Sequence, residues 1–394
     1  INSFSRSLIN ACWSTDPEQR PSFDLIVDKL KSDESFIVDG VDRDEYKKYI
    51  ESINQFTDSL DYLDINDYGK IEKIGYSNFS NVFKVKEKST YKLYAAKVLK
   101  KESGDLTEEE NSLLSRELKI MKKLNHPSII KIKGFSPITF NYNQHPTIIM
   151  ELGNCSLQKM LDLEKNKLSP IQWNFTKKLI NIYGIASGMQ YLHSMNIIHR
   201  DLKPSNILED SHLFPKISDF GLSKEIHKNA ESITFQSILD QKGTTFYIAP
   251  EVWKECNYTK ACDVYAFSMI VYEIISGQQP FKDFNNNFIT KVVNGERPKL
   301  NDTIPECYQK LIERCWSHDL NKRPTFNEIV QLLKTDDFMT DLIDTDEYKK
   351  YIEYVEKYND VNIDTFVFDT IDIDLTRDED IDLISFSSEI KKYD

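Results

Sequence analysis

The sequence predicts an α+β fold, because it contains short apolar runs typical of strands and longer runs typical of helices. Residues 94–98 (YAAKV) and the start of 147–154 (TIIMELGN) are short and apolar, as strands are. Residues 107–124 place leucine and isoleucine near helical spacing. Residues 263–281 are rich in apolar side chains over a length that favours a buried helix. We therefore expect strands and helices together in one chain.

Length and composition predict one large domain with flanking segments in this 394-residue chain. The net charge of −13 argues against binding of nucleic acid to a basic surface. No apolar run approaches the roughly 20 residues that a membrane-spanning helix needs, and no signal-peptide pattern is visible. The six cysteines are scattered without zinc-like spacing, which indicates free thiols in a reducing, cytoplasmic compartment.

Two motifs carry the chemistry. HRDLKPSN contains Asp201, Lys203 and Asn206, and SDFGLS contains Asp219, eighteen positions after Asp201. In phosphoryl transfer the protein mainly positions the reactants and stabilises charge, and it takes little part in covalent chemistry. It does need a carboxylate near the attacking hydroxyl, and a carboxylate with an amide oxygen on Mg²⁺. Either tripeptide alone is a weak signal, but both motifs in full and in this order are highly specific.

With these motifs, the chain resembles the eukaryotic protein-kinase family over residues 67–335. The resemblance implies a two-lobed fold, with a five-stranded sheet and one main helix in a small lobe and mostly helices in a larger one. It implies ATP as the phosphoryl donor, with Mg²⁺ or Mn²⁺. Asp201 would be the base that orients the acceptor hydroxyl, and Lys203 would contact the γ-phosphate. Asn206 and Asp219 would hold the metal.

The resemblance also implies an ion pair that holds the α- and β-phosphates. Lys97, inside the YAAKV run, would contact these phosphates. Its partner should be a helical glutamate about twenty residues later, and Glu117 has that spacing. The alternative is an ordinary solvated charge, because residues 108–110 are also glutamates on or just before the same helix.

The glycine-rich loop departs from the family pattern. In the sequence GYSNFSNV, Gly75 and Val82 match the pattern, but Ser77 and Ser80 replace two glycines. Glycine lets the backbone approach a phosphate closely, whereas serine loses part of that freedom and offers a hydroxyl donor. We expect weaker or more selective nucleotide binding. The alternative is an ordinary hairpin without a ligand.

The surroundings of the adenine are assigned by the resemblance alone. Met150 would be the gatekeeper, and Glu151 and Leu152 would offer backbone groups to the base. A methionine in an apolar strand is more often a plain core residue. The resemblance also implies that Val82 and Ala95 sandwich the adenine ring, and both are equally ordinary as strand residues. The residues assigned to the nucleotide are Ile74, Gly75, Ser77, Ser80, Val82, Ala95, Lys97, Met150, Glu151 and Leu152.

The segment from Asp219 to the APE sequence ending at Glu251 indicates the acceptor class. Thr244 and Lys203 are typical of serine/threonine kinases in the resembled family, so we expect serine and threonine acceptors on protein substrates. Arg200 would pair with a phosphate that an upstream activating kinase adds to this segment. The candidate acceptors within the segment are Ser232, Thr234 and Ser237, with Thr244 and Thr245 expected nearer the substrate.

Two buried ionic residues are expected to hold the larger lobe. The resemblance implies that Asp263 ties down the backbone of the HRD motif and that Arg323 pairs with Glu251. A buried ion pair is a poor stabiliser by itself, but loss of one member is costly. The CWSHDLNKRPTF sequence around Arg323 is most similar to the tyrosine-kinase-like branch of serine/threonine kinases.

An internal repeat links the two ends of the chain. CWSTDPEQRPSFDLIVDKL at 12–30 matches CWSHDLNKRPTFNEIVQLL at 315–333, and DEYKKYIE at 44–51 recurs at 346–353. A repeat this long indicates a duplication. We expect residues 1–60 to be the helical end of an upstream kinase domain plus a linker, as in a tandem kinase. The alternative is a helical regulatory module that serves the second domain.

Two parts follow the kinase-like region. Residues 336–358 are expected to form a helical extension. From Asp360 to Asp394, eleven acidic and three basic residues give a charge of −8. We expect residues 359–394 to be a mostly disordered acidic tail. The alternating run TFVFDTIDIDL leaves open an edge strand or pairing with a basic partner.

Two functional classes remain. The complete catalytic set predicts an ATP-dependent serine/threonine protein kinase that transfers the γ-phosphoryl of Mg-ATP to proteins. The serines of the phosphate loop leave open a kinase-fold scaffold with weak or no use of nucleotide. A small-molecule kinase is disfavoured by GTTFYIAPE, which builds a peptide-binding ledge in the resembled family.

Overall fold

The structure is a computed structural model of the 394-residue chain. The chain separates into two compact units, residues 1–60 and 61–394, and each is described by itself. The residues that the structure describes are 3–16, 20–21, 25–26, 29–30, 43, 62–77, 79–140, 143–225, 245–282, 288–358, 368 and 370–371.

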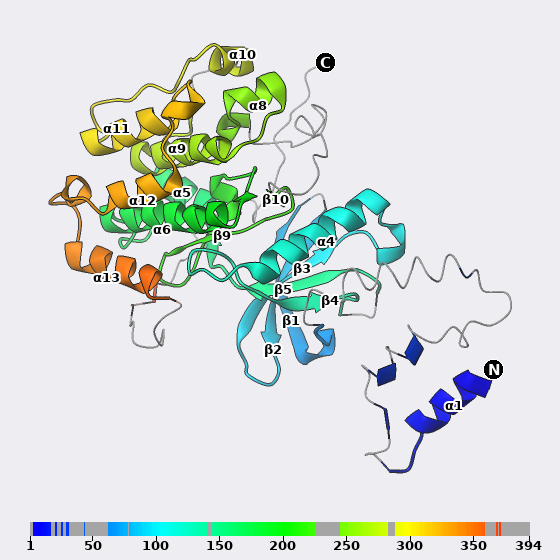
Figure 1. The fold of residues 1–394 in the computed structure, drawn as a ribbon. Helices are drawn as coiled ribbons and strands as arrows, with labels where there is room; N and C mark the ends of the chain where they lie inside the picture. Colours follow the sequence, from blue (N-terminus) through cyan, green and yellow to red (C-terminus); the bar gives the residue numbers. More distant parts are fainter. Residues whose placement is uncertain are drawn as a thin grey trace. The chain divides into compact units, whose positions relative to one another are not determined.

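An antiparallel five-stranded sheet forms the smaller lobe of the second unit (Figure 1). Its strand order is β1-β2-β3-β5-β4. Val85, Ala96 and Ile149 are fully buried on one side of the sheet, where they form a small core. The strands are β1 (Tyr68–Tyr76), β2 (Ser80–Glu87), β3 (Leu93–Leu99), β4 (Ile132–Ser136) and β5 (Thr147–Glu151).

One long helix, α4 (Glu108–Lys123), lies beside this sheet (Figure 1). Thr107 caps it: its hydroxyl accepts the N–H of Glu110 at 3.2 Å, and the Glu110 carboxylate accepts the N–H of Thr107 at 2.9 Å. The first turn carries glutamates and the last carries lysines, which suits the helix dipole. The helix predicted over 107–124 is confirmed, and the two end residues are its caps.

The larger lobe is mostly helical and is built around α6 and α9 (Figure 1). Nearly every residue of these two helices is buried because other helices pack around them. The helix predicted at 263–281 is α9, but it ends at Ser276 because Gly277 adopts φ +66°. The helices are α5 (Leu157–Lys165), α6 (Phe175–Ser194), α8 (Pro250–Glu255), α9 (Lys260–Ser276), α10 (Phe288–Val293), α11 (Glu306–Cys315), α12 (Phe326–Leu333) and α13 (Thr345–Glu356).

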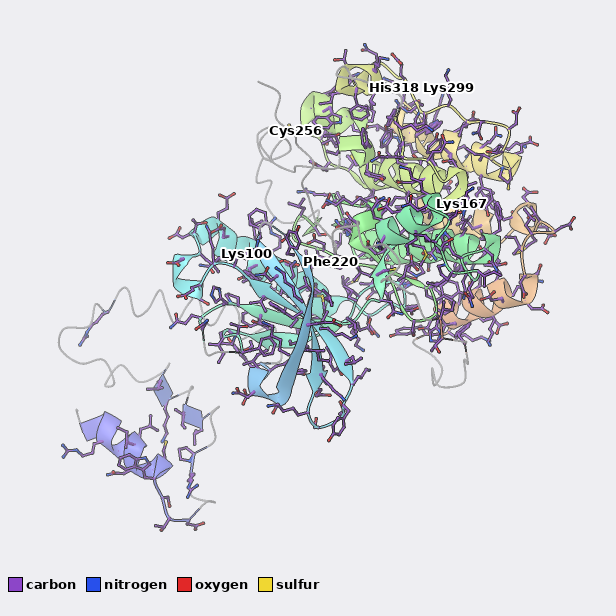
Figure 2. All side chains as sticks on the ribbon, turned by 180° about the vertical axis from the view of Figure 1, so that it is seen from behind. Lys100, Lys167, Phe220, Cys256, Lys299 and His318 are labelled. Carbon is purple, nitrogen blue, oxygen red and sulfur yellow. The ribbon has the colours of Figure 1, made fainter. Side chains whose placement is uncertain are left out.

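The loops of the two catalytic motifs lie between short paired strands. The HRD motif lies between β7 and β8, and the DFG motif between β9 and β10. Phe220 of the DFG motif is fully buried at the junction of the two lobes (Figure 2). The strands are β6 (Cys155–Ser156), β7 (Ile197–Ile198), β8 (Ile207–Glu209), β9 (Pro215–Ile217) and β10 (Lys224–Glu225), paired in the orders β6-β8-β9 and β10-β7.

This architecture confirms the two-lobed α+β fold expected from the sequence. The expected extension contains α13, which packs on α6. Most of the acidic tail lies outside the described residues. Within the described parts of the chain, every helix is too short or too polar to cross a membrane.

The described part of the first unit has the local structure of its copy in the second. Helix α1 (Ser3–Cys12) occupies the same repeat positions as α11. Trp13 N–H donates to the Ile9 carbonyl at 3.0 Å, just as Trp316 N–H donates to the Ile312 carbonyl at 3.0 Å. Trp13 is 78% exposed, whereas Trp316 is 8% exposed. Helix α1 therefore reproduces the backbone of α11, and Trp13 lacks the cover that Trp316 has among the described residues.

The same likeness continues beyond the helix. Arg20 Nε donates to the Ser14 carbonyl at 3.0 Å, and Arg323 Nε donates to the Ser317 carbonyl at 2.8 Å. These pairs are related by the offset of the sequence repeat. The repeated DEYKKYIE sequence at 44–51 lies outside the described residues.

Candidate active site

Lys97 and Glu117 form an ion pair where β3 faces α4. Lys97 Nζ lies 2.8 Å from Glu117 Oε1, and Glu117 is 8% exposed. Burial alone would lower the pKa of Lys97, but the carboxylates of Glu117 and Asp219 outweigh it and raise that pKa above its ordinary value. Lys97 is therefore a fixed cation between the sheet and the helix.

Asp219 lies on the other side of this cation. Its Oδ1 is 3.5 Å from Lys97 Nζ. Asp219 has φ +64°, a left-handed conformation that costs energy in any residue with a side chain. Burial tends to raise the pKa of Asp219, but the nearby Lys97 and Lys203 lower it below its ordinary value. Asp219 is therefore an ionised carboxylate at neutral pH.

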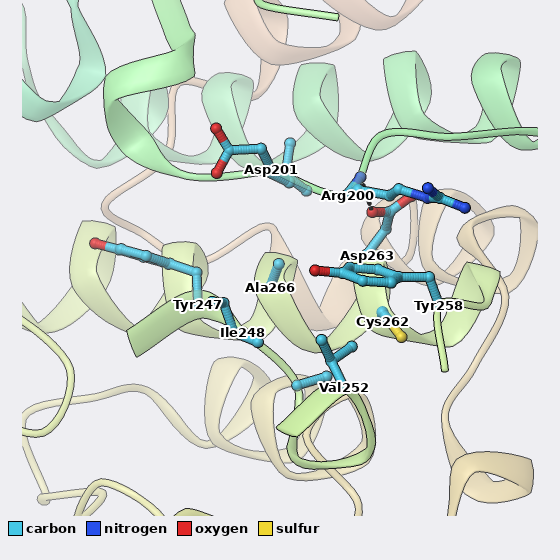
Figure 3. A pocket seen from close by; sticks show the side chains of 11 residues that line it. Arg200, Asp201, Tyr247, Ile248, Val252, Tyr258, Cys262, Asp263 and Ala266 are labelled. Atoms are coloured by element: carbon cyan, nitrogen blue, oxygen red, sulfur yellow. Dashed lines mark hydrogen bonds between the residues drawn. The ribbon is translucent and has the colours of Figure 1, made fainter. Parts of the chain in front are cut away.

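The HRD loop is held by Asp263 at the start of α9 (Figure 3). Asp263 accepts the backbone N–H groups of His199 at 2.9 Å and Arg200 at 3.0 Å, and it lies 2.8 Å from His193 Nε2. Arg200 has φ +71°, and the side chains of Arg200 and Asp201 point in opposite directions (Figure 3). Asp263 thus ties down the motif backbone, as expected, and helps present Asp201 on one side.

Two side chains of the same loop converge on Asp201. Lys203 Nζ lies 2.8 Å from Asp201 Oδ2. Asn206 Nδ2 donates to Asp201 Oδ2 and to its backbone oxygen, each at 2.8 Å. The short 3₁₀ turn Pro204–Asn206 brings Asn206 back to Asp201. The three polar residues predicted from HRDLKPSN therefore form one cluster.

Asn206 and Asp219 fit a divalent metal ion. Asn206 is fully buried, and its Oδ1 has no hydrogen-bond partner among the described residues. A buried oxygen in this state is costly unless a cation or another donor satisfies it. The backbone N–H of Ser218 donates to the Asn206 carbonyl at 2.8 Å, which keeps the neighbouring Asp219 close. Amide and carboxylate oxygens are ligands that Mg²⁺ prefers.

His199 joins the two motif loops and was not among the predicted site residues. Its Nδ1 accepts the N–H of Asp201 at 3.3 Å, and its Nε2 lies 3.1 Å from the Ser218 carbonyl. The proton therefore resides on Nε2, because the carbonyl can only accept. The ring also contacts Phe220, with ring centroids 5.3 Å apart. Its position inside the HRD motif was the signal that could have identified it.

Ser77 and Ser80 brace the turn between β1 and β2. Ser77 Oγ accepts the backbone N–H groups of Phe79 at 3.2 Å and Ser80 at 3.0 Å, and Ser77 N–H donates to the Ser80 carbonyl at 2.7 Å. The two hydroxyls lie 3.1 Å apart. Two backbone donors that a glycine loop leaves for phosphate are thus satisfied within this turn.

The residues assigned to the adenine lie on adjacent strands. The sheet register places Ala95 opposite Met150, Val82 opposite Lys97, and Gly75 opposite Val82. The sheet therefore holds in one set of paired strands residues that are up to 75 positions apart in the sequence, from Gly75 to Met150. The remaining assigned residues, Ile74, Glu151 and Leu152, are half-buried at the end of β1 and at the end of β5.

Glu251 and Arg323 form the expected buried pair. Arg323 Nη1 and Nη2 lie 2.6 Å and 2.9 Å from the two carboxylate oxygens of Glu251. The Arg323 side chain is fully buried, and Cys262 Sγ lies 3.3 Å from Glu251 Oε1. Such a two-pronged, charge-assisted pair fixes geometry as well as charge. It joins α8 to the loop before α12.

A pocket lies beside the catalytic loop, between Arg200, Tyr258 and the start of α9 (Figure 3). The Arg200 guanidinium lies over the Tyr258 ring at 5.0 Å. Burial lowers the pKa of Arg200, and its Nε lacks a hydrogen-bond partner among the described residues. The expected phosphorylation sites Ser232, Thr234 and Ser237, and also Thr244, lie outside those residues.

The sequence was compared with known proteins. A family model described as protein kinase domain matches residues 68–333. The chain is 31% identical over 383 residues to the dual specificity protein kinase pyk3 of Dictyostelium discoideum, which covers 89% of this chain and 26% of that protein. It is 34% identical over 270 residues to a protein of the same organism named "Probable serine/threonine-protein kinase", covering 67% of this chain and 19% of that protein.

A similar likeness extends to a human receptor. The chain is 31% identical over 299 residues to ephrin type-B receptor 4 of Homo sapiens, which covers 74% of this chain and 29% of the receptor. The chain thus spans less than a third of the length of each of these three relatives.

Proposed function

This chain belongs to the protein kinase family, and on that premise we propose that it transfers the γ-phosphoryl group of ATP to serine and threonine hydroxyls of proteins. The observation that supports this most directly is the dual use of Asn206. Its amide nitrogen holds Asp201, and its amide oxygen is left buried without a donor among the described residues. Asn206 thereby links the proposed base, Asp201, to a proposed metal ligand, its own amide oxygen.

Each group in the cluster has a role in the proposed reaction. The acceptor oxygen forms a bond to the γ-phosphorus, the bond from that phosphorus to the bridging oxygen breaks, and ADP leaves. Asp201 orients the acceptor hydroxyl and takes its proton. Lys203, 2.8 Å from Asp201, places positive charge where the γ-phosphoryl oxygens would lie.

The remaining groups hold the nucleotide in place. Lys97, fixed by Glu117, would contact the α- and β-phosphates. Asn206 and Asp219 would hold Mg²⁺ or Mn²⁺. When bound, that ion supplies charge that offsets the negative oxygens of the phosphates.

The acceptor class is the finer part of the proposal. Lys203, two residues after Asp201, supports serine and threonine acceptors, as does similarity to a protein named as a serine/threonine kinase. Other relatives are named as a dual specificity kinase and an ephrin receptor, so tyrosine is the alternative to serine and threonine as the acceptor. We assign the chain to the tyrosine-kinase-like branch of serine/threonine kinases on its CW and RPTF spacing.

One observation favours a second function, a kinase-fold scaffold with weak use of nucleotide. The hydroxyl of Ser77 already accepts the two N–H groups of Phe79 and Ser80. A phosphate would have to displace these bonds. Nucleotide affinity therefore separates the enzyme from the scaffold.

Activation by phosphorylation is part of the proposal. Arg200 is a half-buried cation whose buried Nε has no hydrogen-bond partner among the described residues, a site that suits an added phosphate. An upstream kinase acting on Ser232, Thr234 or Ser237 would supply it. We place the protein in the cytoplasm, where its six free cysteines would stay reduced.

We also propose that residues 1–60 are the end of a second kinase lobe, as in a tandem kinase. Helix α1 and the Arg20–Ser14 bond repeat the backbone of α11 and the Arg323–Ser317 bond. In the second unit, Arg323 is buried against Glu251, so Arg20 would require an equivalent glutamate. The competing account is a regulatory module that serves the second unit.

The experiment that tests the proposed function identifies the acceptor. The full chain is incubated with Mg-ATP labelled on the γ-phosphate and a generic basic protein, which is then hydrolysed to its amino acids. We expect phosphoserine and phosphothreonine. Phosphotyrosine alone would overturn the assigned acceptor class, and the absence of both transfer and nucleotide binding would favour the scaffold.

A further inference from the structure

Helix α13 docks on the larger lobe through two buried tyrosines. Tyr348 and Tyr351 are 0% and 1% exposed. Both pack against the Tyr183 ring on α6 in T-shaped contacts, with ring centroids 5.9 Å and 6.2 Å apart. Burial raises the pKa of each hydroxyl well above its ordinary value, so both are neutral hydrogen-bonding groups.

Polar contacts fix the helix at its start. The backbone N–H of Asp344, the N-cap residue of α13, donates to Thr176 Oγ1 at 2.8 Å. Lys177 Nζ lies 2.7 Å from Glu347 Oε1, and the Lys177 side chain is only 7% exposed. Loss of Glu347 would leave the buried Lys177 cation without its partner, which is costly. The extension is therefore an integral part of the lobe.

Tyr351 reaches past a glycine toward the other side of α6. A Cβ at Gly184 would lie 2.4 Å from the Tyr351 hydroxyl oxygen and 2.6 Å from Pro215 Cγ, so only glycine leaves room here. The hydroxyl oxygen ends 3.2 Å from Ser128 Oγ, within hydrogen-bond distance, and both residues are buried. Ser128 belongs to the loop that follows α4.

Ser128 is in turn paired with the strand that leads to Asp219. The N–H of Ile217 donates to the Ser128 carbonyl at 2.8 Å, and the N–H of Ile130 donates to the Ile217 carbonyl at 2.9 Å. Ile217 ends β9, two residues before Asp219. One serine therefore connects the α13 hydroxyl to the backbone that presents a metal-binding carboxylate.

The segment after α13 adds a second anchor on the same side. The Phe368 ring meets Phe214 at 4.8 Å, and Phe214 meets Tyr351 at 4.5 Å. The N–H of Ile371 donates to the Ser211 carbonyl at 2.6 Å. These contacts hold the turn between β8 and β9, which precedes the DFG motif.

We propose that Tyr351 is a positioning residue for Asp219, acting through Ser128 and Ile217. The extension would then be a working part of the catalytic unit. This inference rests on the proposed function, because Asp219 is the residue that would hold the metal. The repeat supports it, since DEYKKYIE at 44–51 carries the same two tyrosines as α13.

The test compares Tyr351→Phe with a matched control in the full chain. Tyr348→Phe removes the other buried hydroxyl of α13, which donates to the Leu333 carbonyl at 2.9 Å and does not reach Ser128. Two quantities are measured. One is the Mg²⁺ concentration that half-saturates binding of a fluorescent ATP analogue. The other is deuterium exchange in peptides that cover residues 126–131 and 215–219.

We expect Tyr351→Phe to raise the half-saturating Mg²⁺ concentration about fivefold, which is the effect of one lost hydrogen bond. Exchange should quicken in both peptides, whereas Tyr348→Phe should change neither quantity. Ser128→Ala should reproduce the effect of Tyr351→Phe, and the double variant should add nothing further, since both changes remove one bond.

The two proposals can fail separately. If the wild-type chain binds no nucleotide, the proposed function fails, and the exchange data still decide the positioning role. Equal effects of Tyr351→Phe and Tyr348→Phe, or unchanged exchange at residues 215–219 in Tyr351→Phe, would overturn that role.

Discussion

The side-chain amide of Asn206 donates to both the carboxylate and the backbone oxygen of Asp201, each at 2.8 Å. Because the amide nitrogen is fixed in this way, the amide oxygen must point elsewhere, and it is buried without a hydrogen-bond partner among the described residues. The proposed base therefore sets the orientation of the proposed metal ligand. Removing either side chain should disturb both functions, whereas Asp201→Asn keeps a side-chain oxygen that can still accept from the Asn206 amide.

Asn206→Ala should weaken Mg²⁺ binding and slow phosphoryl transfer, each by at least about tenfold. The variant loses a ligand oxygen and also the donor that holds Asp201. A Mg²⁺ titration of nucleotide binding and of transfer rate measures both effects. Asn181→Ala is the control, because Asn181 is also buried but bonds the carbonyls of Lys177 and Leu213. The same Mg²⁺ dependence in both variants would contradict the assignment.

Arg323→Met should destabilise the larger lobe by about 3–5 kcal/mol, because it leaves the Glu251 carboxylate buried without its cation. Denaturant unfolding measures this loss. The double variant Arg323→Met with Glu251→Gln should lose less than the sum of the single changes. As a control, Lys310→Met breaks the exposed pair with Glu306 and should leave stability unchanged. A loss in the control as large as in Arg323→Met would refute the explanation.

Glu209 should make the protein less stable as pH rises toward neutrality. It is fully buried, and neither carboxylate oxygen has a partner among the described residues. Burial raises its pKa from 4.5 to about 8. Between these values the unfolded chain is ionised while the folded protein stays neutral, so stability falls as pH rises through this window.

Glu209→Gln should remove that fall, which is at most about 1.4 kcal/mol per pH unit. Urea unfolding of both proteins at pH 5.5 and pH 7.5 tests this. The wild type should lose more stability than the variant between the two pH values. Equal losses would mean that Glu209 does not titrate as its burial implies.

His126 should act in the opposite direction on the acid side. Its Nδ1 accepts the Ser128 N–H at 3.1 Å, and its Nε2 lies 3.2 Å from Ser187 Oγ. Burial lowers its pKa from 6.5 to about 3. Above pH 6.5 the ring is neutral in both states, so its contribution to stability is complete.

As pH falls from 6.5 toward 3, the unfolded chain takes up a proton that the folded protein excludes, and stability is lost. His126→Gln should have a shallower loss between pH 6.5 and pH 5. Chemical unfolding across this range measures the slope. A variant with the same slope as the wild type would show that other groups cause the acid sensitivity.

The sequence was most informative where chemistry depends on short spacing. Asp201, Lys203 and Asn206 lie within six positions, so one tight loop had to bring them together. Helix α4 was predictable because its apolar spacing and end residues are local signals. Lys97 and Glu117 needed the family resemblance, since their 2.8 Å contact joins two separate elements.

Other relationships depend on tertiary packing that no local pattern encodes. Tyr351 and Ser128 are 223 positions apart, and their contact exists only because Gly184 lets the ring pass. Glu209 looks like an ordinary polar residue at the end of a strand, yet packing buries it completely. The bonds of Ser77 depend on the exact turn that the backbone takes.

We propose that Asp201 serves phosphoryl transfer, and a comparison of transfer by the wild-type chain and by Asp201→Asn tests this role. Both proteins receive Mg-ATP and a generic basic protein, and nucleotide binding is measured in parallel. We expect transfer by the wild type and a rate at least about a hundredfold lower in Asp201→Asn, with nucleotide affinity little changed. Equal rates in the two proteins, or no transfer by a wild type whose activation segment is phosphorylated, would contradict it.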